Sequence, residues 1–199
     1  MNIPMPKTLL QMRDVSIPRA RLSDASFVII DAQADYHSGR LPLFGIDQAL
    51  ANIAALLARA REAGTPIFHV TQLGQAGGLF DGDGGAILPQ AAPMPDEPVI
   101  MKRLPNAFAG TELHDRLQQA GRRNLILAGF MTHMCVGASA RAGLDLGYHV
   151  NVVADATATR ALPAHDGGAP IAAHEVHRTA LAELADRFAA VVMRAEIAA

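Results

Sequence analysis

The chain has little cysteine, no excess of positive charge and no long apolar run. Its 199 residues include one cysteine, Cys135, which excludes a disulfide within the chain and favours a reducing compartment. A formal net charge of −2 provides no basic excess for binding nucleic acid. No apolar stretch is long enough to span a membrane, and Lys7, Gln11 and several prolines interrupt the first residues, where a signal peptide would be apolar. We therefore expect a cytoplasmic protein that binds neither nucleic acid nor membranes.

What the chain does contain is a regular alternation of short apolar runs and amphipathic segments. The apolar runs predict strands at 27–30, 66–71, 99–101, 125–130, 150–154 and 188–193. The amphipathic segments predict helices at 46–63, 110–120, from 135 to about 146, and at 171–186. Such alternation is typical of an α/β fold, in which helices cover both faces of a parallel sheet.

The length of the chain fits one domain of this kind. Residues 25–199 are expected to form that domain, without an internal repeat. Residues 1–24 carry Pro4, Pro6 and Pro18 and have weak periodicity. They predict an N-terminal arm that packs over the domain or over a partner subunit.

Cys135 lies where an apolar strand gives way to a helix. Unpaired backbone N–H groups and the helix dipole at such a place stabilise a thiolate, and also an oxyanion formed beside it. The alternative is that Cys135 is a small buried core residue, which is the commonest fate of a free cysteine. Its position in the sequence leaves both interpretations open.

Two further chemical groups stand at predicted strand ends, Asp31 and Lys102. In parallel sheets the functional site lies at the carboxyl ends of the strands, so both are expected near Cys135. There Asp31 could take the thiol proton, and Lys102 could hold the thiolate. Taken singly, Asp31 could cap a turn and Lys102 could be a solvated lysine. The conjunction of the three favours a catalytic site.

The residues around these three positions carry recognisable motifs. They are Ile-Asp-Ala-Gln at 30–33, Lys102 followed by the segment 106–111, the Gly-x-x-Thr-x-x-Cys-Val pattern at 129–136, and Asp-Ala at 155–156. With these motifs, residues 27–192 resemble the isochorismatase-like cysteine hydrolases. That family includes nicotinamidases, N-carbamoylsarcosine amidohydrolases and isochorismatases.

The resemblance implies a three-layer α/β/α fold with a six-stranded parallel sheet in the order 3-2-1-4-5-6. It also implies a catalytic triad of Asp31, Lys102 and Cys135. A cis peptide bond is implied between Phe130 and Met131, with the N–H groups of Met131 and Cys135 forming an oxyanion hole. In that strand order Lys102 starts about 10 Å from Asp31, so the chain near it is expected to bend inward.

The glycine-rich segment 72–98 is too long for an ordinary connection, which is typical of a lid or a binding loop. Its glycine-rich part, residues 74–85, lacks the Gly-Lys-Ser/Thr ending of a nucleotide site, so we interpret that part as a mobile lid. Nicotinamidases carry an Asp-x-His metal cluster at this place, whereas this chain has Gln-Leu-Gly at 72–74. We therefore expect neither a metal nor another cofactor. The residues predicted to contact the substrate are Gln33, Tyr36, Phe44, Phe108 and His133.

The leading functional interpretation is a cysteine hydrolase that cleaves a small amide or carbamoyl compound through a thioester. The alternatives are a vinyl-ether hydrolase of the isochorismatase type and a non-catalytic binding protein on the same fold. We also expect a homo-oligomer, either a dimer or a tetramer. Lys102 would favour a thiolate near neutral pH, while burial and the charge of Asp31 would oppose it.

Overall fold

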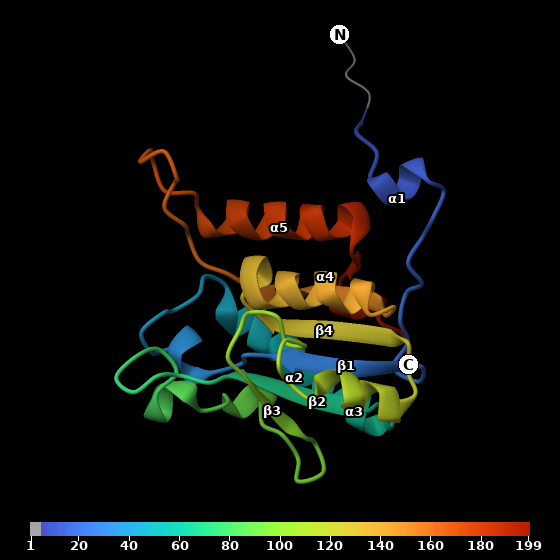
Figure 1. Ribbon diagram of the computed structural model, residues 1–199, viewed down its shortest axis with the longest axis horizontal. Coiled ribbons are helices and arrows are strands. Elements are labelled where there is room, and N and C mark those ends of the chain that lie inside the picture. Colours follow the sequence, from blue (N-terminus) through green and yellow to red (C-terminus); the bar gives the residue numbers. More distant parts are fainter. Residues whose placement is uncertain (1–4) are drawn as a thin grey trace.

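The computed structural model describes residues 5–199, and its centre is one sheet of six parallel strands (Figure 1). The strands are β1 (Ala25–Ile30), β2 (Ile67–Gln72), β3 (Val99–Lys102), β4 (Asn124–Phe130), β5 (His149–Ala158) and β6 (Ala190–Val192). Their order across the sheet is β3-β2-β1-β4-β5-β6. The predicted fold class and strand order are therefore confirmed.

Helices cover both faces of the sheet, because alternate residues of its strands point to opposite sides. The helices are α1 (Leu9–Met12), α2 (Ile46–Glu62), α3 (Leu113–Ala120), α4 (Gly137–Asp145) and α5 (Ala173–Arg187). Phe27 and Ile29 of β1 belong to the apolar cluster that includes α2. Val28 and Ile30 belong to the cluster that includes residues of α3, α4 and α5. In Figure 1, α2 lies behind the strands and α3 in front of them.

The central strands approach closely at Gly129 of β4. A Cβ atom at this residue would lie 2.0 Å from the carbonyl oxygen of Ile30, and its φ of +111° is one that side chains disfavour. The pairing of β4 with β5 shifts its register between Leu127 and Gly129. Beyond this irregularity β5 continues to Ala158, which makes it longer than the sequence pattern predicted.

The part of the arm from Pro18 to Leu22 packs on its own domain. The side chain of Asn151, on β5, donates to the carbonyl of Pro18 and accepts from the N–H of Ala20, each at 3.1 Å. Thr65 donates to the carbonyl of Leu22 at 2.8 Å. Ala20 and Leu22 are buried. The first four residues of the predicted arm lie outside the described part of the chain.

Replacing Asn151 with alanine should reduce the free energy of unfolding by about 2 kcal/mol, because it leaves backbone groups of the arm without partners. Urea denaturation measures this change, with Gln90→Ala as the control, since Gln90 is exposed on the surface. Equal stability of the two variants would contradict the anchoring role of Asn151.

Candidate active site

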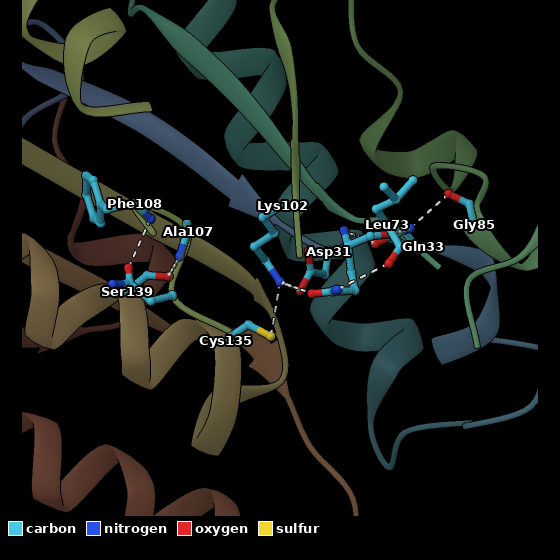
Figure 2. A network of polar contacts seen from close by, with 11 residues as sticks. Asp31, Gln33, Leu73, Gly85, Lys102, Ala107, Phe108, Cys135 and Ser139 are labelled. Atoms are coloured by element: carbon cyan, nitrogen blue, oxygen red, sulfur yellow. Dashed lines mark hydrogen bonds and ion pairs between the residues drawn. The ribbon is translucent and has the colours of Figure 1, made fainter. Parts of the chain in front are cut away.

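Three side chains from different strand ends meet at one edge of the sheet (Figure 2). Asp31 follows β1, Lys102 is the last residue of β3, and Cys135 lies in the turn after β4. Lys102 Nζ is 2.8 Å from Asp31 Oδ2 and donates to Cys135 Sγ at 3.4 Å. All three residues are buried. The structure thus brings together the carboxylate, the ammonium and the thiol that the sequence placed at strand ends.

Lys102 reaches Asp31 across the intervening strand β2. Its backbone stays in register with Gln72 of β2, so the expected inward bend of the chain is wrong. The long side chain spans the distance instead, and its ammonium also donates to Gln72 Oε1 at 2.7 Å. The ammonium therefore has three partners, one for each proton that it carries.

Gln72 was missed as a site residue in the sequence. Its position in the sequence could have indicated a role in the site, because Gln72 occupies the end of β2, where nicotinamidases carry a metal ligand. In this chain the position supplies a neutral acceptor for Lys102. Among residues 5–199, no group of three or more histidine, cysteine, aspartate or glutamate side chains could hold a metal ion.

Cys135 belongs to a π-helical turn, Thr132–Val136, rather than to the first turn of the following helix. The α-helix α4 begins just after this turn, at Gly137. The peptide bond between Phe130 and Met131 is cis, as the resemblance implied. Asp31 has a φ of +51°, which is uncommon for a residue other than glycine. Unusual backbone conformations therefore occur at both Asp31 and the turn that carries Cys135.

Burial dominates the electrostatics of the site. It raises the pKa of the Cys135 thiol to about 12, and the charge of Asp31 acts in the same direction, while Lys102 opposes both. Burial also raises the pKa of Asp31 from its ordinary value, against the opposing effect of Lys102. Burial and the charge of Asp31 therefore outweigh the effect of Lys102, so that the thiol form of Cys135 is favoured over the thiolate.

A cavity of about 590 Å³ opens above Cys135. Met131 and Met134 line it beside the thiol, and so does Tyr36, as predicted. The other lining residues come from four stretches of chain. Leu41 follows β1, Arg103 and Pro105 follow β3, and Arg160 follows β5. The end of β2 and the segment after it supply the rest, which are Gln72, Leu73, Gly74, Gln75, Gly78, Leu79 and Phe80. The two arginines were not identified from the sequence, because neither belongs to a motif.

Four of the predicted substrate contacts lie outside this cavity. Phe108 stacks on Tyr148, with ring centroids 6.0 Å apart, and is partly buried against the apolar cluster that includes residues of α3. Phe44 is 70% exposed and lines separate grooves beside α5. The side chain of His133 is hydrogen-bonded to Thr159. The structure does not support these three residues as walls of the cavity above Cys135.

The fourth residue, Gln33, is buried, and its side-chain amide is hydrogen-bonded to backbone groups of other segments. Its side-chain oxygen accepts from the N–H of Gln72 at 2.8 Å. Its side-chain nitrogen donates to the carbonyls of Gln72 and Gly85, at 3.1 and 2.9 Å. Since both ends of the amide are occupied by backbone groups, the prediction that Gln33 contacts the substrate is not supported.

Comparison with known proteins identifies the class to which this fold and site belong. Residues 25–196 match the family model of the isochorismatase domain, so the chain belongs to the isochorismatase family of hydrolases. The crystal structure of an isochorismatase from Pseudomonas putida KT2440 is similar, with a TM-score of 0.93 and 46% identity over 97% of this chain and 100% of that chain. A secreted isochorismatase effector of Verticillium dahliae is 35% identical over 89% of this chain and 92% of its own length.

Relatives named as hydrolases of particular substrates are also found. Streptothricin hydrolase of Streptomyces noursei is 34% identical over 71% of this chain and 57% of its own length. Maleamate amidohydrolase of Pseudomonas putida is 28% identical over 71% of this chain and 75% of its own length. Within residues 5–199, no helix is both long and apolar enough to cross a membrane.

Replacing Asp31 with asparagine should separate thiol reactivity from turnover. Removal of the carboxylate leaves Lys102 beside the thiol, so the pKa of Cys135 falls and alkylation by iodoacetamide at pH 8 becomes faster by about tenfold. Hydrolysis should nevertheless be lost, because the base is gone.

The control is Asp155→Asn, because the carboxylate of Asp155 accepts a hydrogen bond from the N–H of Arg194 and not from the thiol. This control should alkylate at the wild-type rate. An Asp31→Asn variant that alkylates no faster than wild type would show that Asp31 does not act on the thiol.

Proposed function

We propose that the protein is a cysteine hydrolase that cleaves a C–N bond in a small amide or carbamoyl compound. The single observation that carries the proposal is the position of Lys102 Nζ, between Asp31 Oδ2 and the Sγ of Cys135, which lines a cavity. A carboxylate beside a thiol can act as its base, and the ammonium fixes the pair in place. The hydrolases of amides among the relatives support the same chemistry.

The first half of the reaction forms a thioester. Cys135 Sγ attacks the carbonyl carbon while its proton passes to Asp31, and the carbonyl oxygen becomes an oxyanion. We assign the N–H groups of Met131 and Cys135 as its donors, in keeping with their motif positions. The C–N bond then breaks, and Asp31 gives the proton to the departing nitrogen. The leaving group is thus a neutral amine or ammonia.

The second half hydrolyses the thioester. Asp31 takes a proton from a water molecule as its oxygen attacks the thioester carbon. The C–S bond breaks, the acid is released, and the proton returns to Cys135. Through both halves Lys102 keeps its positive charge and stabilises whichever neighbour is negative. Atoms and protons balance without a metal or another cofactor.

The arginines of the cavity favour a substrate that also carries a negative charge. The Nε–H of Arg160 is buried without a hydrogen-bond partner, while its Nη1 donates to the carbonyl of Ala161 at 3.1 Å. Arg103 is exposed at the same cavity, and no aspartate or glutamate is among the lining residues. A carboxylate would satisfy such guanidinium groups. Maleamate, in the name of one relative, is an amide of this class.

A vinyl-ether hydrolase remains the second candidate, because the similar Pseudomonas structure is that of an isochorismatase. That reaction releases a carbonyl compound and no amine, so the nature of the products separates the two. A non-catalytic binding protein is disfavoured. Burying an ion pair has a desolvation cost, and a protein that only binds a ligand does not need such a pair at this place.

A panel of matched substrates should identify the activity. We expect kcat/KM to be about tenfold or more higher for monoamides of dicarboxylic acids than for neutral amides of the same size, since a charged hydrogen bond contributes about 1.5–3 kcal/mol. Arg160→Gln should remove most of this preference, whereas Arg178→Gln, on the exposed side of α5, should not. Ammonia release measures the rate.

The nucleophile is checked in the same assay with Cys135→Ala, which should fold normally and release no ammonia. Turnover retained by this variant would exclude a thioester mechanism. A preference for neutral amides in the wild type would exclude the carboxylate-binding role of Arg160.

A further inference from the structure

The segment 74–85 forms one wall of the cavity above Cys135. Gly78, Leu79 and Phe80 of this wall segment line the cavity. It lies against the turn that follows β1, to which Tyr36 and Leu41 of the same cavity belong. The size of the site therefore depends on how these two stretches of chain are held together.

Asp35 lies between them, behind the cavity surface. The residue is 4% exposed, and its Oδ2 accepts from the N–H of Phe80 at 2.6 Å. Its Oδ1 accepts from the N–H of Arg40 at 3.0 Å. The N–H of Phe80, and next that of Arg40, hold the pKa of this carboxyl below its ordinary value. Asp35 is therefore charged at neutral pH and bound to both stretches.

Two glycines make room for this carboxylate. A Cβ atom at Gly84 would lie 2.7 Å from its carbon and both oxygens, and one at Gly39 would lie 2.3 Å from Oδ1. One of these glycines comes from each stretch, so each backbone approaches the carboxylate more closely than a side chain would permit. The packing specifies an aspartate at this position, because a longer side chain has no space.

The contact with Asp35 fixes a backbone conformation that a phenylalanine disfavours. Phe80 has a φ of +62°, in the left-handed region that suits glycine. Its ring packs edge-on against Tyr36, with centroids 5.0 Å apart. Tyr36 in turn packs against Phe130 at 6.1 Å, next to the turn that carries Cys135. The wall is thus packed against the element that holds the thiol.

The ends of the wall segment have anchors of their own. Gln33 binds the backbone of Gln72 before the segment and the carbonyl of Gly85 at its end (Figure 2). Arg40 Nη1 donates to the carbonyls of Gly77 and Gly78, at 2.6 and 2.9 Å. Asp35 is the anchor for the part between, where Leu79 and Phe80 face the cavity. These contacts hold the segment as a wall of the cavity in this structure, and the mobile lid expected from the sequence stays a prediction.

We propose that Asp35 is a positioning residue that fixes Leu79 and Phe80 as the cavity wall and so limits the size of the substrate. Asp35 is not among the residues that line the cavity, so it acts on the substrate only through the positions of Leu79 and Phe80. The consequence for substrate size rests on the proposed function. The position of the wall can be tested independently of turnover, because Cys135 is the only cysteine of the chain.

The test compares the access of small and large reagents to Cys135. In Asp35→Asn the negative charge is lost and an amide NH₂ group must face the N–H of either Phe80 or Arg40, so that the link between the two stretches is weakened. The rate of modification by a fluorescein maleimide, divided by the rate with iodoacetamide, should rise by about fivefold or more. With a small amide as substrate, KM should rise by a similar factor and kcat should change by less than about threefold. Asp83→Asn, an exposed carboxylate on the same segment, should match wild type in every measurement.

Gly84→Ala is the second variant, because it displaces the carboxylate without removing its charge. It should increase the reagent ratio in the same direction. A ratio unchanged in both variants overturns the proposal, even where the melting temperature falls. Failure of both variants to fold would also overturn it, since Asp35 would then be a determinant of stability. A raised ratio in a protein that hydrolyses no amide would support the wall and refute the proposed function instead.

Discussion

The interaction on which the site depends is the buried ion pair of Lys102 and Asp31. Burying these charges is costly unless each has partners, and the ammonium meets this condition with the carboxylate, Gln72 Oε1 and Cys135 Sγ. The order of the strands supplies the geometry. β2 separates β3 from β1, so a side chain as long as lysine is needed to cross it, and Gln72 on β2 supports the ammonium on its way.

This arrangement explains how a thiol that is hard to ionise can act as a nucleophile. Burial favours the protonated form of Cys135, and a buried thiol is protected from indiscriminate reaction. The same burial raises the pKa of Asp31, which makes that carboxylate a stronger base for the thiol proton. In this account Lys102 serves chiefly to hold the negative charge as it moves between its two neighbours.

Much of the fold, and the grouping of Asp31, Lys102 and Cys135 at one edge of the sheet, could be predicted from the sequence, because both depend on local patterns. Buried strands give apolar runs, and Asp31, Lys102 and Cys135 sit in ordered motifs at their ends. The cavity walls could not be predicted in this way. Arg160 and the wall segment are positioned by loop conformation, and Phe108 shows that an aromatic residue within a motif can pack against the core instead of lining the cavity. The expected homo-oligomer stays a prediction, which sedimentation analysis would test.

The central claim is that Cys135 forms a covalent intermediate within the triad. Mass spectrometry of the intact protein, quenched with acid during turnover of a monoamide substrate, tests it most directly. The account predicts a mass increase equal to the acyl group, located on Cys135 by peptide mapping and absent from Cys135→Ala. Turnover at full rate with no adduct on Cys135, under conditions that preserve a synthetic thioester of the same protein, would contradict it.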